Sequence, residues 1–371
     1  MYRRAPPQRR AGRAVGAPLP GAAGVPGGRV APRHRPGAAA LARGHTRRGK
    51  TLSAPHIAAL GGGTGLSSLL RGLKQHRADL TAIVTVADDG GSSGRLRREL
   101  GVLPPGDIRN CLVALADDES LMGRLFQHRF ADGDLSGHPF GNLFLAALAE
   151  VTGDFDTAVQ ECSRVLKIRG SVLPSTLQHV RLWAERESGE EVCGETNIAA
   201  GVGACRRVWL DPAPEAHAPA VESILDADLV VLGPGSLFTS VLPHLAVPAI
   251  ADALARTRAV RAYVCNVMTQ PGETDGFSAS RHVGRILDAV PGGLDVAVVH
   301  DGPLDPAAVR RYEAEGQAVV DLDAAAVEAL GVRVWRADLA EETSVVRHDP
   351  TALAAVLMDV AREAGGFPAP G

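Results

Sequence analysis

The body of the chain alternates short apolar runs with segments in which apolar residues recur every three or four positions. His56 to Leu60 and Leu80 to Ala87 are nearly continuous apolar runs, which is typical of strands covered on both faces. Between them, Leu66 to Gln75 places its leucines on one helical face. Strands that alternate with helices indicate β-α-β units and a parallel sheet. The pattern therefore predicts an α/β fold from Pro55 onward.

The same alternation continues toward the C-terminus. Four more helices are predicted before the middle of the chain, at 107–117, 120–130, 140–151 and 154–167. Later apolar runs predict strands at 228–232, 260–265 and 294–299, and an amphipathic helix at 350–363. The order of these elements is that of a doubly wound, mostly parallel Rossmann-like sheet.

Residues 178–210 follow a different pattern. Two strands are predicted at 179–185 and 205–210, around a Ser188-Gly189 turn and polar linkers. We therefore expect a small additional antiparallel subregion. No repeat of fixed period is present, and residues 54–365 are expected to form a single nucleotide-ligand-binding domain.

The first 53 residues have a composition unlike the rest of the chain. They are rich in Arg, Pro, Gly and Ala, hold no Asp or Glu, and show no periodic apolar pattern. Such a segment buries too little apolar surface to offset its ordering entropy, so we expect residues 1–53 to form a disordered basic extension. A secretory signal is excluded because no continuous apolar run is present. A transit peptide and a nucleic-acid-binding arm stay open beside a segment without function.

Charge and composition narrow the class of protein. The 371 residues are 45% hydrophobic and 22% charged, which is ordinary for a globular protein. No apolar run approaches the roughly 18 residues that span a bilayer, so membrane insertion is not expected. Residues 1–50 hold 12 of the 39 Lys and Arg, which leaves 27 basic residues against 42 acidic ones in the remainder. An acidic body argues against nucleic-acid binding by the folded domain.

The five cysteines stand apart from one another and form no C-x-x-C motif. This spacing suits free, mostly buried thiols in a reducing compartment, and it favours neither a disulfide framework nor a zinc site. We therefore expect a cytoplasmic protein.

Four of the predicted strands are followed by polar, glycine-rich loops. The loops begin at Gly61, Asp88, Gly233 and Asn266. In an open parallel sheet these strand ends lie on one edge, where ligands bind. The convergence of four such loops predicts a binding crevice at that edge.

The first loop is Gly61-Gly62-Gly63-Thr64-Gly65. It is not a G-x-G-x-x-G motif, because Leu66 stands at the third glycine position, and no Gly-Lys-Ser/Thr follows as in a Walker A loop. Residues without bulky side chains still let backbone N–H groups approach an anion at a helix N-terminus. This favours phosphate binding over a simple tight turn.

Asp88 and Asp89 follow the second strand, where a dinucleotide-binding fold places its ribose-binding acid. The two carboxylates are alternatively ligands for magnesium that bridges phosphates, or turn-forming residues before Gly90. Gly91, Ser92 and Ser93 continue this loop, and Arg95 is positioned to hold an anionic group, whereas Arg97 and Arg98 are expected on a solvated helix face.

Two further segments open helices with polar residues. Gly106-Asp107-Ile108-Arg109-Asn110 makes Asp107 a candidate N-cap, which leaves Arg109 and Asn110 to be explained by a ligand. In Gly137-His138-Pro139-Phe140-Gly141-Asn142, His138 is a candidate acid-base group or phosphate partner, with a capping or packing role equally open. The catalytic residues stay unknown, with Asp88, Asp89 and His138 as candidates.

Long strings in this order resemble the gluconeogenesis factor family (YvcK-type), within the group related to 2-phospho-L-lactate transferase (CofD-like proteins). The matching strings cover about residues 56–360 and are GGGTGL at 61–66, TVADDGGSSGRL at 85–96, PPGDIRNCL at 104–112, GH-x-FGN at 137–142, LGPGSLFTS at 232–240 and NVMTQPGET at 266–274. Arg347-His348-Asp349 resembles the C-terminal motif of the family. Pro139 and Pro350 depart from the family pattern without removing the expected contacts.

The resemblance implies a Rossmann-like fold, a cytoplasmic location and a role in cell-shape maintenance during gluconeogenic growth. It also implies a ligand of the UDP-N-acetylglucosamine type, with Arg347 helping to hold it. Together, the motifs and the resemblance give these expected ligand-binding residues: Gly61, Gly62, Gly63, Thr64, Gly65, Asp88, Asp89, Gly91, Ser92, Ser93, Arg95, Asp107, Arg109, Asn110, His138, Asn142, Gly235, Ser236, Thr239, Asn266, Thr269, Gln270 and Arg347.

Two functions from different classes fit these residues. The first is a nucleotide-sugar-binding regulatory protein that catalyses no reaction. The second is a 2-phospho-L-lactate transferase-like enzyme that moves a phospho-group from a nucleotide-activated donor to an alcohol, with Asp88 and Asp89 holding magnesium. A deazaflavin acceptor needs a wide aromatic or apolar slot, and 3 Trp, 3 Tyr and 8 Phe provide little for one, which favours the regulatory protein. The oligomeric state is left open, with a homodimer as one alternative.

Overall fold

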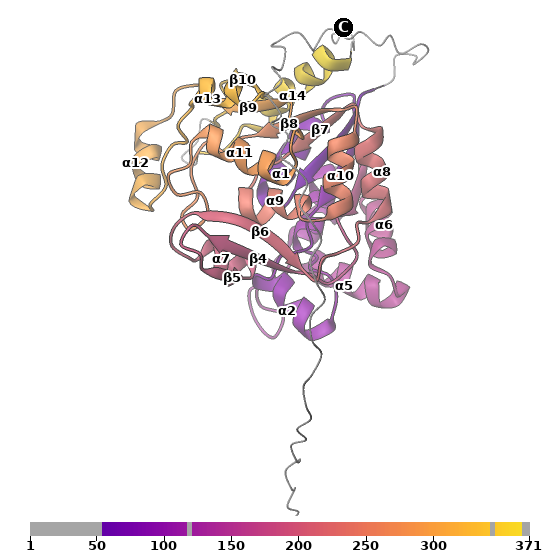
Figure 1. Cartoon of the computed structure of the whole chain (residues 1–371). Coiled ribbons are helices and arrows are strands. Elements are labelled where there is room, and N and C mark those ends of the chain that lie inside the picture. The colour runs from indigo at the N-terminus through magenta and orange to yellow at the C-terminus, as the bar shows by residue number, and fades with distance from the viewer. Residues whose placement is uncertain (1–53, 117–120, 342–345, 366–371) are drawn as a thin grey trace, which may run out of the picture. The chain divides into compact units, whose positions relative to one another are not determined.

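The computed structural model describes residues 54–116, 121–341 and 346–365 (Figure 1). The predicted basic extension, residues 1–53, lies outside the described residues. Within them, the predicted alternation of strands and helices is confirmed.

Seven parallel strands form the main sheet. Their order across the sheet is β10-β9-β8-β7-β1-β2-β3. The strands are β1 (His56–Gly61), β2 (Asp79–Val84), β3 (Ser171–Pro174), β7 (Leu229–Leu232), β8 (Val260–Val264), β9 (Val296–His300) and β10 (Arg333–Ala337). The central strands β1 and β7 are buried almost throughout, as their continuous apolar sequences predict. The sequence patterns did not identify β3 and β10, which are short or half-exposed edge strands.

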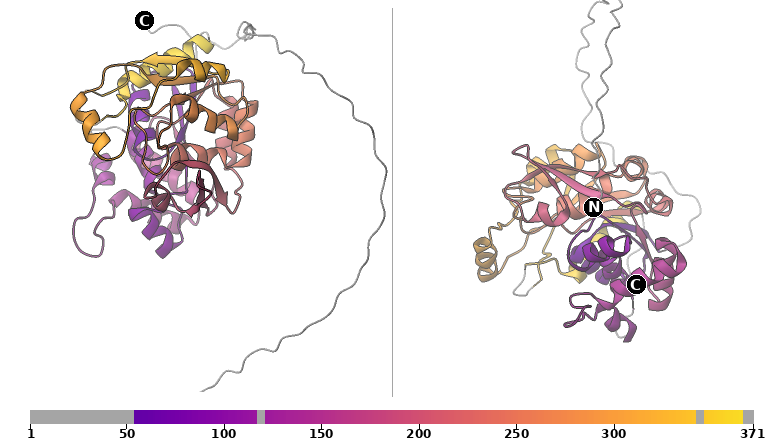
Figure 2. Two further views of the ribbon diagram at one scale, coloured as in Figure 1. Left: turned by 60° about the vertical axis from the view of Figure 1, so that its left-hand side comes forward. Right: turned by 90° about the horizontal axis from the view of Figure 1, so that it is seen from below.

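Helices lie on both faces of this sheet (Figure 2). The strand order reverses between β1 and β7, so right-handed crossovers place the helices of the two halves on opposite faces. On one face, α1 (Gly63–Leu73) packs against α3 (Gly106–Leu115) and α14 (Pro350–Gly365). The other half contributes the helices α8 (Ala218–Asp226), α10 (Pro248–Arg256), α11 (Ala279–Ala289), α12 (Pro306–Ala314) and α13 (Ala324–Ala329).

The small antiparallel subregion is confirmed. It is a three-stranded sheet in the order β5-β4-β6, with β4 at Arg181–Arg186, β5 at Glu191–Cys193 and β6 at Cys205–Asp211. The short helix α7 (Glu195–Ala199) lies in sequence between β5 and β6. Trp183 and Trp209 stack with their ring centroids 6.0 Å apart, on the face opposite the buried Leu182 and Arg186.

Within the described residues, the remaining elements are five helices and one π-helical turn. They are α2 (Gly91–Leu100), α4 (Leu121–Gln127), α5 (Phe140–Thr152), α6 (Phe155–Leu166), the π-helical turn η1 (Leu237–Val241) and α9 (Leu242–Leu245). The expectation that Arg97 lies on a solvated face is wrong, because its guanidinium is half-buried and donates to the Val180 carbonyl. Arg98 is exposed, as expected.

The expectation of free, mostly buried thiols is confirmed. All five cysteines are free, and four of them are buried. In the part of the chain that the structure describes, no single helix combines the length and apolar character needed to cross a bilayer. One helix pair meets that test only when joined, Leu237–Leu245 with Pro248–Arg256, and it is bent by 78°.

Candidate functional site

The loops after β1 and β7 meet at the point where the strand order of the sheet reverses. A Cβ atom on Gly65 would lie 2.4 Å from the carbonyl oxygen of Pro234, so the two loops are in direct backbone contact. Open α/β sheets bind ligands at this topological switch point. Two of the four glycine-rich loops that were predicted to converge therefore meet here.

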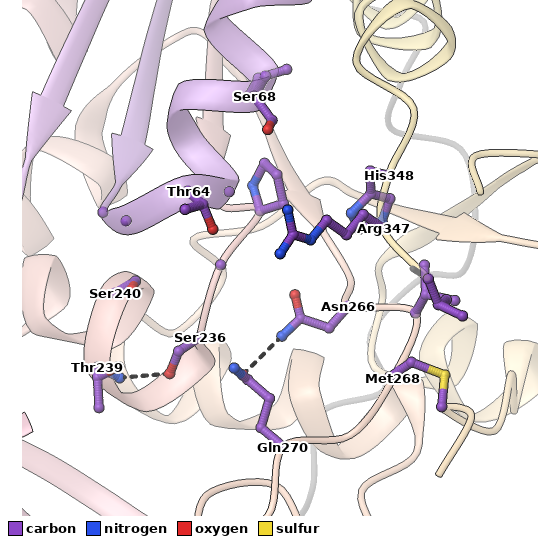
Figure 3. A pocket seen from close by; sticks show the side chains of 18 of the residues that line it. Thr64, Ser68, Ser236, Thr239, Ser240, Asn266, Met268, Gln270, Arg347 and His348 are labelled. Carbon is purple, nitrogen blue, oxygen red and sulfur yellow. Dashed lines mark hydrogen bonds between the residues drawn. The ribbon is translucent and has the colours of Figure 1, made fainter. Parts of the chain in front are cut away.

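A pocket of about 420 Å³ opens at this point, and we call it the first pocket. Its volume falls within the roughly 300–1,000 Å³ that small-molecule sites occupy. Ten of the expected ligand-binding residues line it: Gly62, Gly63, Thr64, Gly65, Gly235, Ser236, Thr239, Asn266, Gln270 and Arg347. Figure 3 shows that the labelled side chains among them, such as Thr64, Ser236 and Arg347, come from segments far apart in the sequence.

The N-terminus of α1 forms one wall of the first pocket. Its N-cap residue, Gly62, offers no side chain to the first-turn N–H groups. Gly63 has a φ of +62°, which favours glycine there. The ring of buried His244 forms a 3.0 Å hydrogen bond with the Gly61 carbonyl, and burial lowers the pKa of His244 to about 4. A neutral histidine thus fixes a loop in which the N–H groups of Thr64 and Gly65 are available to an anion.

The loops after β7 and β8 form the opposite wall. Ser236 caps η1, because its Oγ accepts a 3.1 Å hydrogen bond from the Thr239 backbone N–H. The same hydroxyl donates to the carboxylate of Glu273. Asn266 donates through Nδ2 to Gln270 Oε1 at 3.2 Å. These bonds leave the remaining amide groups of Asn266 and Gln270 available to a polar ligand.

Arg347 brings the positive charge of the first pocket. Figure 3 shows its side chain directed into the pocket, toward the side where Thr64 lies. Within the described residues, no hydrogen bond or ion pair engages its guanidinium group. The neighbouring His348 also lines the pocket, and burial lowers its pKa to about 4. Arg347 is therefore a cation without a partner in a pocket that also presents a helix N-terminus.

Acidic side chains line the same region and have raised pKa values. Burial, followed by the nearby Asp88, raises the pKa of Glu195 to about 9. Burial also raises the pKa of Glu273, which lines the pocket beside Ser236. A carboxyl group with such a pKa is protonated near neutral pH, so Glu195 is a hydrogen-bond donor there. A protonated Glu195 does not repel a phosphate group.

The residues expected from the 85–110 and 137–142 segments do not line the first pocket. Eight of them line a separate, smaller pocket of about 220 Å³, which we call the second pocket: Asp88, Gly91, Ser92, Ser93, Asp107, Arg109, Asn110 and Asn142. Asp107 is not an N-cap, because α3 begins at Gly106 after Pro105. Burial, followed by Asp88, raises the pKa of Asp107 to about 6.

Five expected residues line neither pocket. They are Gly61, Asp89, Arg95, His138 and Thr269. The carboxylate of Asp89 accepts from the backbone N–H and the hydroxyl of Thr196 at 3.1 and 3.0 Å. Arg95 donates to the Ser136 carbonyl at 2.7 Å. The structure gives these side chains partners inside the protein.

His138 is buried, and its Nδ1 forms a 2.8 Å hydrogen bond with Ser92 Oγ. Burial lowers the pKa of His138, which favours the neutral ring, and this ring holds Ser92 Oγ in place. Asp88 and Asp89 face different partners, since Asp88 accepts from the Gly90 N–H. Within the described ranges, no group of three or more His, Cys, Asp or Glu is arranged to hold a metal. Magnesium at this pair stays a prediction.

Several pocket residues were not anticipated from the sequence. In the first pocket they include Ser68, Glu195, Ser240, Met268, Glu273, Tyr312, Gln317 and His348, and in the second Arg129. Glu195 and Tyr312 belong to α7 and α12, which the apolar pattern did not predict. Four of these residues lay inside strings matched to the family, which was the available signal: Ser240, Met268, Glu273 and His348.

Known proteins are similar in sequence to this chain over most of its length. The family model of the 2-phospho-L-lactate transferase CofD matches residues 57–340. A gluconeogenesis factor from Bacillus subtilis is 48% identical over 317 residues, which cover 83% of this chain and 99% of that protein. A gluconeogenesis factor from Halalkalibacterium halodurans is 46% identical, covering 82% of this chain and 96% of that protein.

A solved structure agrees with these sequence matches. The crystal structure of a UPF0052 family member from Bacillus halodurans superposes with a TM-score of 0.80 at 45% identity, covering 83% of this chain and all of that one. Identity at this level over most of the chain goes beyond a shared fold. The chain belongs to the family of the 2-phospho-L-lactate transferase CofD, and its relatives within that family are gluconeogenesis factors.

Proposed function

We propose that the first pocket binds a nucleotide sugar of the UDP-N-acetylglucosamine type and that the protein is a cytoplasmic regulator. Its relatives are gluconeogenesis factors, and we extend that role to this chain, including maintenance of cell shape during gluconeogenic growth. The observation that carries the proposal is the pairing of the N-terminus of α1 with the unpartnered Arg347 across one pocket.

The chemistry of the pocket suits the parts of such a ligand. The N–H groups of Thr64 and Gly65 and the Arg347 guanidinium suit a diphosphate. The amides of Asn266 and Gln270 provide both donors and acceptors for a base or a sugar hydroxyl. Glu195, protonated because of its raised pKa, adds a donor beside them.

A transferase is the second candidate, because the family model is that of 2-phospho-L-lactate transferase. Such an enzyme would move a phospho-group from the activated donor to an alcohol, and Asp107, with a pKa near 6, is suited to accept the proton. The two candidates share the donor site, and they differ in whether the ligand leaves intact.

Calorimetric titration of the full chain with UDP-N-acetylglucosamine, with and without magnesium, tests the proposal. Arg347→Ala removes a charge-assisted contact to phosphate, so affinity should fall about tenfold or more. Arg258→Ala is the matched control, since Arg258 is exposed and lines neither pocket. The ligand is recovered afterwards and analysed by chromatography.

Saturable binding that Arg347→Ala weakens and Arg258→Ala does not, with the ligand recovered intact, supports the regulator. Cleaved ligand recovered in amounts that grow with time would replace it with the transferase. Absence of binding would remove the nucleotide sugar as the ligand of the first pocket.

A further inference from the structure

The second pocket lies where the first turns of three helices meet. Ser92 and Ser93 come from α2, Gly106 and Asn110 from α3, and Asn142 from α5. The pocket shares no lining residue with the first pocket. A ligand bound here is therefore separate from the proposed nucleotide sugar.

The N-termini of three helices face this pocket, and the first N–H groups of α3 and α5 donate to Ser93 Oγ at 3.1 Å and to the His128 carbonyl at 2.8 Å. The three helices are 10, 10 and 13 residues long, and their N-cap residues, Gly90, Pro105 and Pro139, make no side-chain cap hydrogen bond. The first N–H groups of a helix have no partner within the helix, and the macrodipole places about half a positive charge there. Three such ends around one pocket give a positive potential from the backbone alone.

Two buried side chains at the pocket have unused polar atoms. Asn142 is 2% exposed, and its amide donates to Ser92 Oγ at 3.1 Å while its Oδ1 has no partner. Arg109 is 9% exposed, and its Nη2 donates to Asn110 Oδ1 at 2.6 Å while its Nε has no partner. Buried polar groups in proteins are nearly always paired. These two are independent indications of a ligand.

The charges of the pocket are separated into two sides. Arg109 and Arg129 both line it, and burial followed by the charge of Arg129 lowers the pKa of Arg109 to about 10. The stem of Arg109 passes against Gly141 of α5, where a Cβ would lie 2.9 Å from its Cδ. On the other side, Asp107 packs against Gly62 of the first loop, and Asp88 lies beside Gly106. An anion between the two arginines would relieve their repulsion.

We propose that the second pocket binds the phosphate group of a small hydroxylated metabolite, held between Arg109, Arg129 and the three helix N-termini. The hydroxyl groups of the ligand face Asp88 and Asp107, whose carboxyl groups accept hydrogen bonds. A volume of about 220 Å³ is below the range of pockets that take drug-sized ligands, so the ligand is smaller than a nucleotide. With the ring proton of His138 on Nδ1, Ser92 Oγ accepts from His138 and Asn142, and its own hydroxyl donates to the phosphate.

Titration of the full chain with inorganic phosphate and with glycerol 3-phosphate, followed by calorimetry, tests this site. We expect saturable binding of one equivalent of each, and at least fivefold weaker binding in Arg129→Gln. Arg129 is exposed, so this variant should fold normally. Arg124→Gln is the matched control, because Arg124 is an exposed arginine of α4 that lines neither pocket.

A second variant addresses the buried part of the site. Asn142→Asp has nearly the same shape and adds a negative charge, so it should abolish phosphate binding while its thermal unfolding confirms folding. Crystals soaked in tungstate should show the heavy anion between Arg109 and Arg129. Both measurements are independent of nucleotide-sugar binding.

The outcomes separate this site from the proposed function. Phosphate binding that persists in the presence of saturating UDP-N-acetylglucosamine, and nucleotide-sugar affinity that Arg129→Gln leaves unchanged, support the second site. Stoichiometric displacement of phosphate by UDP-N-acetylglucosamine would place the anion in the first pocket and overturn it. Equal phosphate affinity in Arg129→Gln and the wild type would also overturn it.

Discussion

Arg186 connects the small antiparallel sheet to the loop that lines the first pocket. It is 3% exposed and donates to the carbonyl groups of Ile198, Gly203 and Gly272 at 3.0, 2.9 and 2.6 Å. Ile198 belongs to α7, and Gly272 follows Gln270 in the loop after β8. Arg186 lines neither pocket, so any effect of its removal on the ligand is indirect.

Replacing Arg186 by Met keeps most of the buried volume and removes all three hydrogen bonds. Bonds from a charged donor contribute roughly 1.5–3 kcal/mol each, and loss of a donor leaves its acceptors unpaired. The three losses are not additive, because the loops relax together. We expect a loss of about 4 kcal/mol in the free energy of unfolding. Without these hydrogen bonds, α7 and the 270–273 loop are no longer held in place relative to each other. The affinity for the nucleotide sugar should therefore also fall.

Arg207→Met on the same sheet is the control. Arg207 is exposed and pairs with Glu185, and exposed ion pairs contribute about 0–1 kcal/mol. Urea unfolding followed by circular dichroism, and calorimetric titration with UDP-N-acetylglucosamine, measure the two effects. If Arg186→Met is no less stable than Arg207→Met, the assignment of Arg186 as the connection between these segments is refuted.

Three further predictions concern individual positions. Gly65→Ala places a Cβ 2.4 Å from a facing carbonyl oxygen and should weaken nucleotide-sugar binding about tenfold in calorimetry, because the two loops must separate. Gly72→Ala meets the Pro350 carbonyl at 1.9 Å and should lower the free energy of unfolding in urea by about 2 kcal/mol. Glu195→Gln should gain stability relative to the wild type as the pH rises from 5 to 9, measured by thermal unfolding. The reason is that the folded pKa, near 9, exceeds the ordinary 4.5, so ionisation opposes folding across that window.

Matched substitutions check these three. Gly284→Ala lies in α11 with no atom within 4 Å of the added Cβ, and it should stabilise by up to about 1 kcal/mol, opposite in sign to Gly72→Ala. Glu191→Gln, at an exposed position of β5, should show no pH-dependent gain. Nucleotide-sugar affinity of Gly65→Ala equal to that of the wild type would contradict the proposed role of the glycine loop.

The sheet was predictable because its central strands are continuous apolar runs. Such runs are typical of strands that are buried on both faces of a sheet. Ile57 to Leu60 and Leu229 to Leu232 are buried on both faces, and no helical period competes with that pattern. Arg97 and Arg98 were expected on a helix, but the bounds of α2 were not predicted because Gly91, Gly94 and three arginines hide its apolar face. Strand β10 was missed because each of its residues is half-buried or exposed.

The site was predicted as one crevice, whereas the structure divides its residues between two pockets. Sequence order shows that the loops after β1 and β2 share an edge of the sheet, but it carries no information on how far apart they lie along that edge. The helices α2 and α3, which follow β2 before the chain reaches β3, carry their polar first turns into the second pocket. Arg129 has no motif around it, because its role comes from the fold of the 121–139 segment back onto Pro139.

The wall between the two pockets bears on the choice between a regulator and a transferase. A Cβ on Gly62 would lie 2.7 Å from Asp107 Oδ2 and 2.9 Å from Thr85 Cγ2, so the wall leaves no room for even a methyl group. Asp107 accepts from the Gly63 backbone N–H on one side and lines the second pocket on the other. Transfer between ligands held in the two pockets would require this carboxyl group to leave both contacts. A regulator needs no such opening, since each pocket binds its ligand with the wall in place, and this supports binding without turnover.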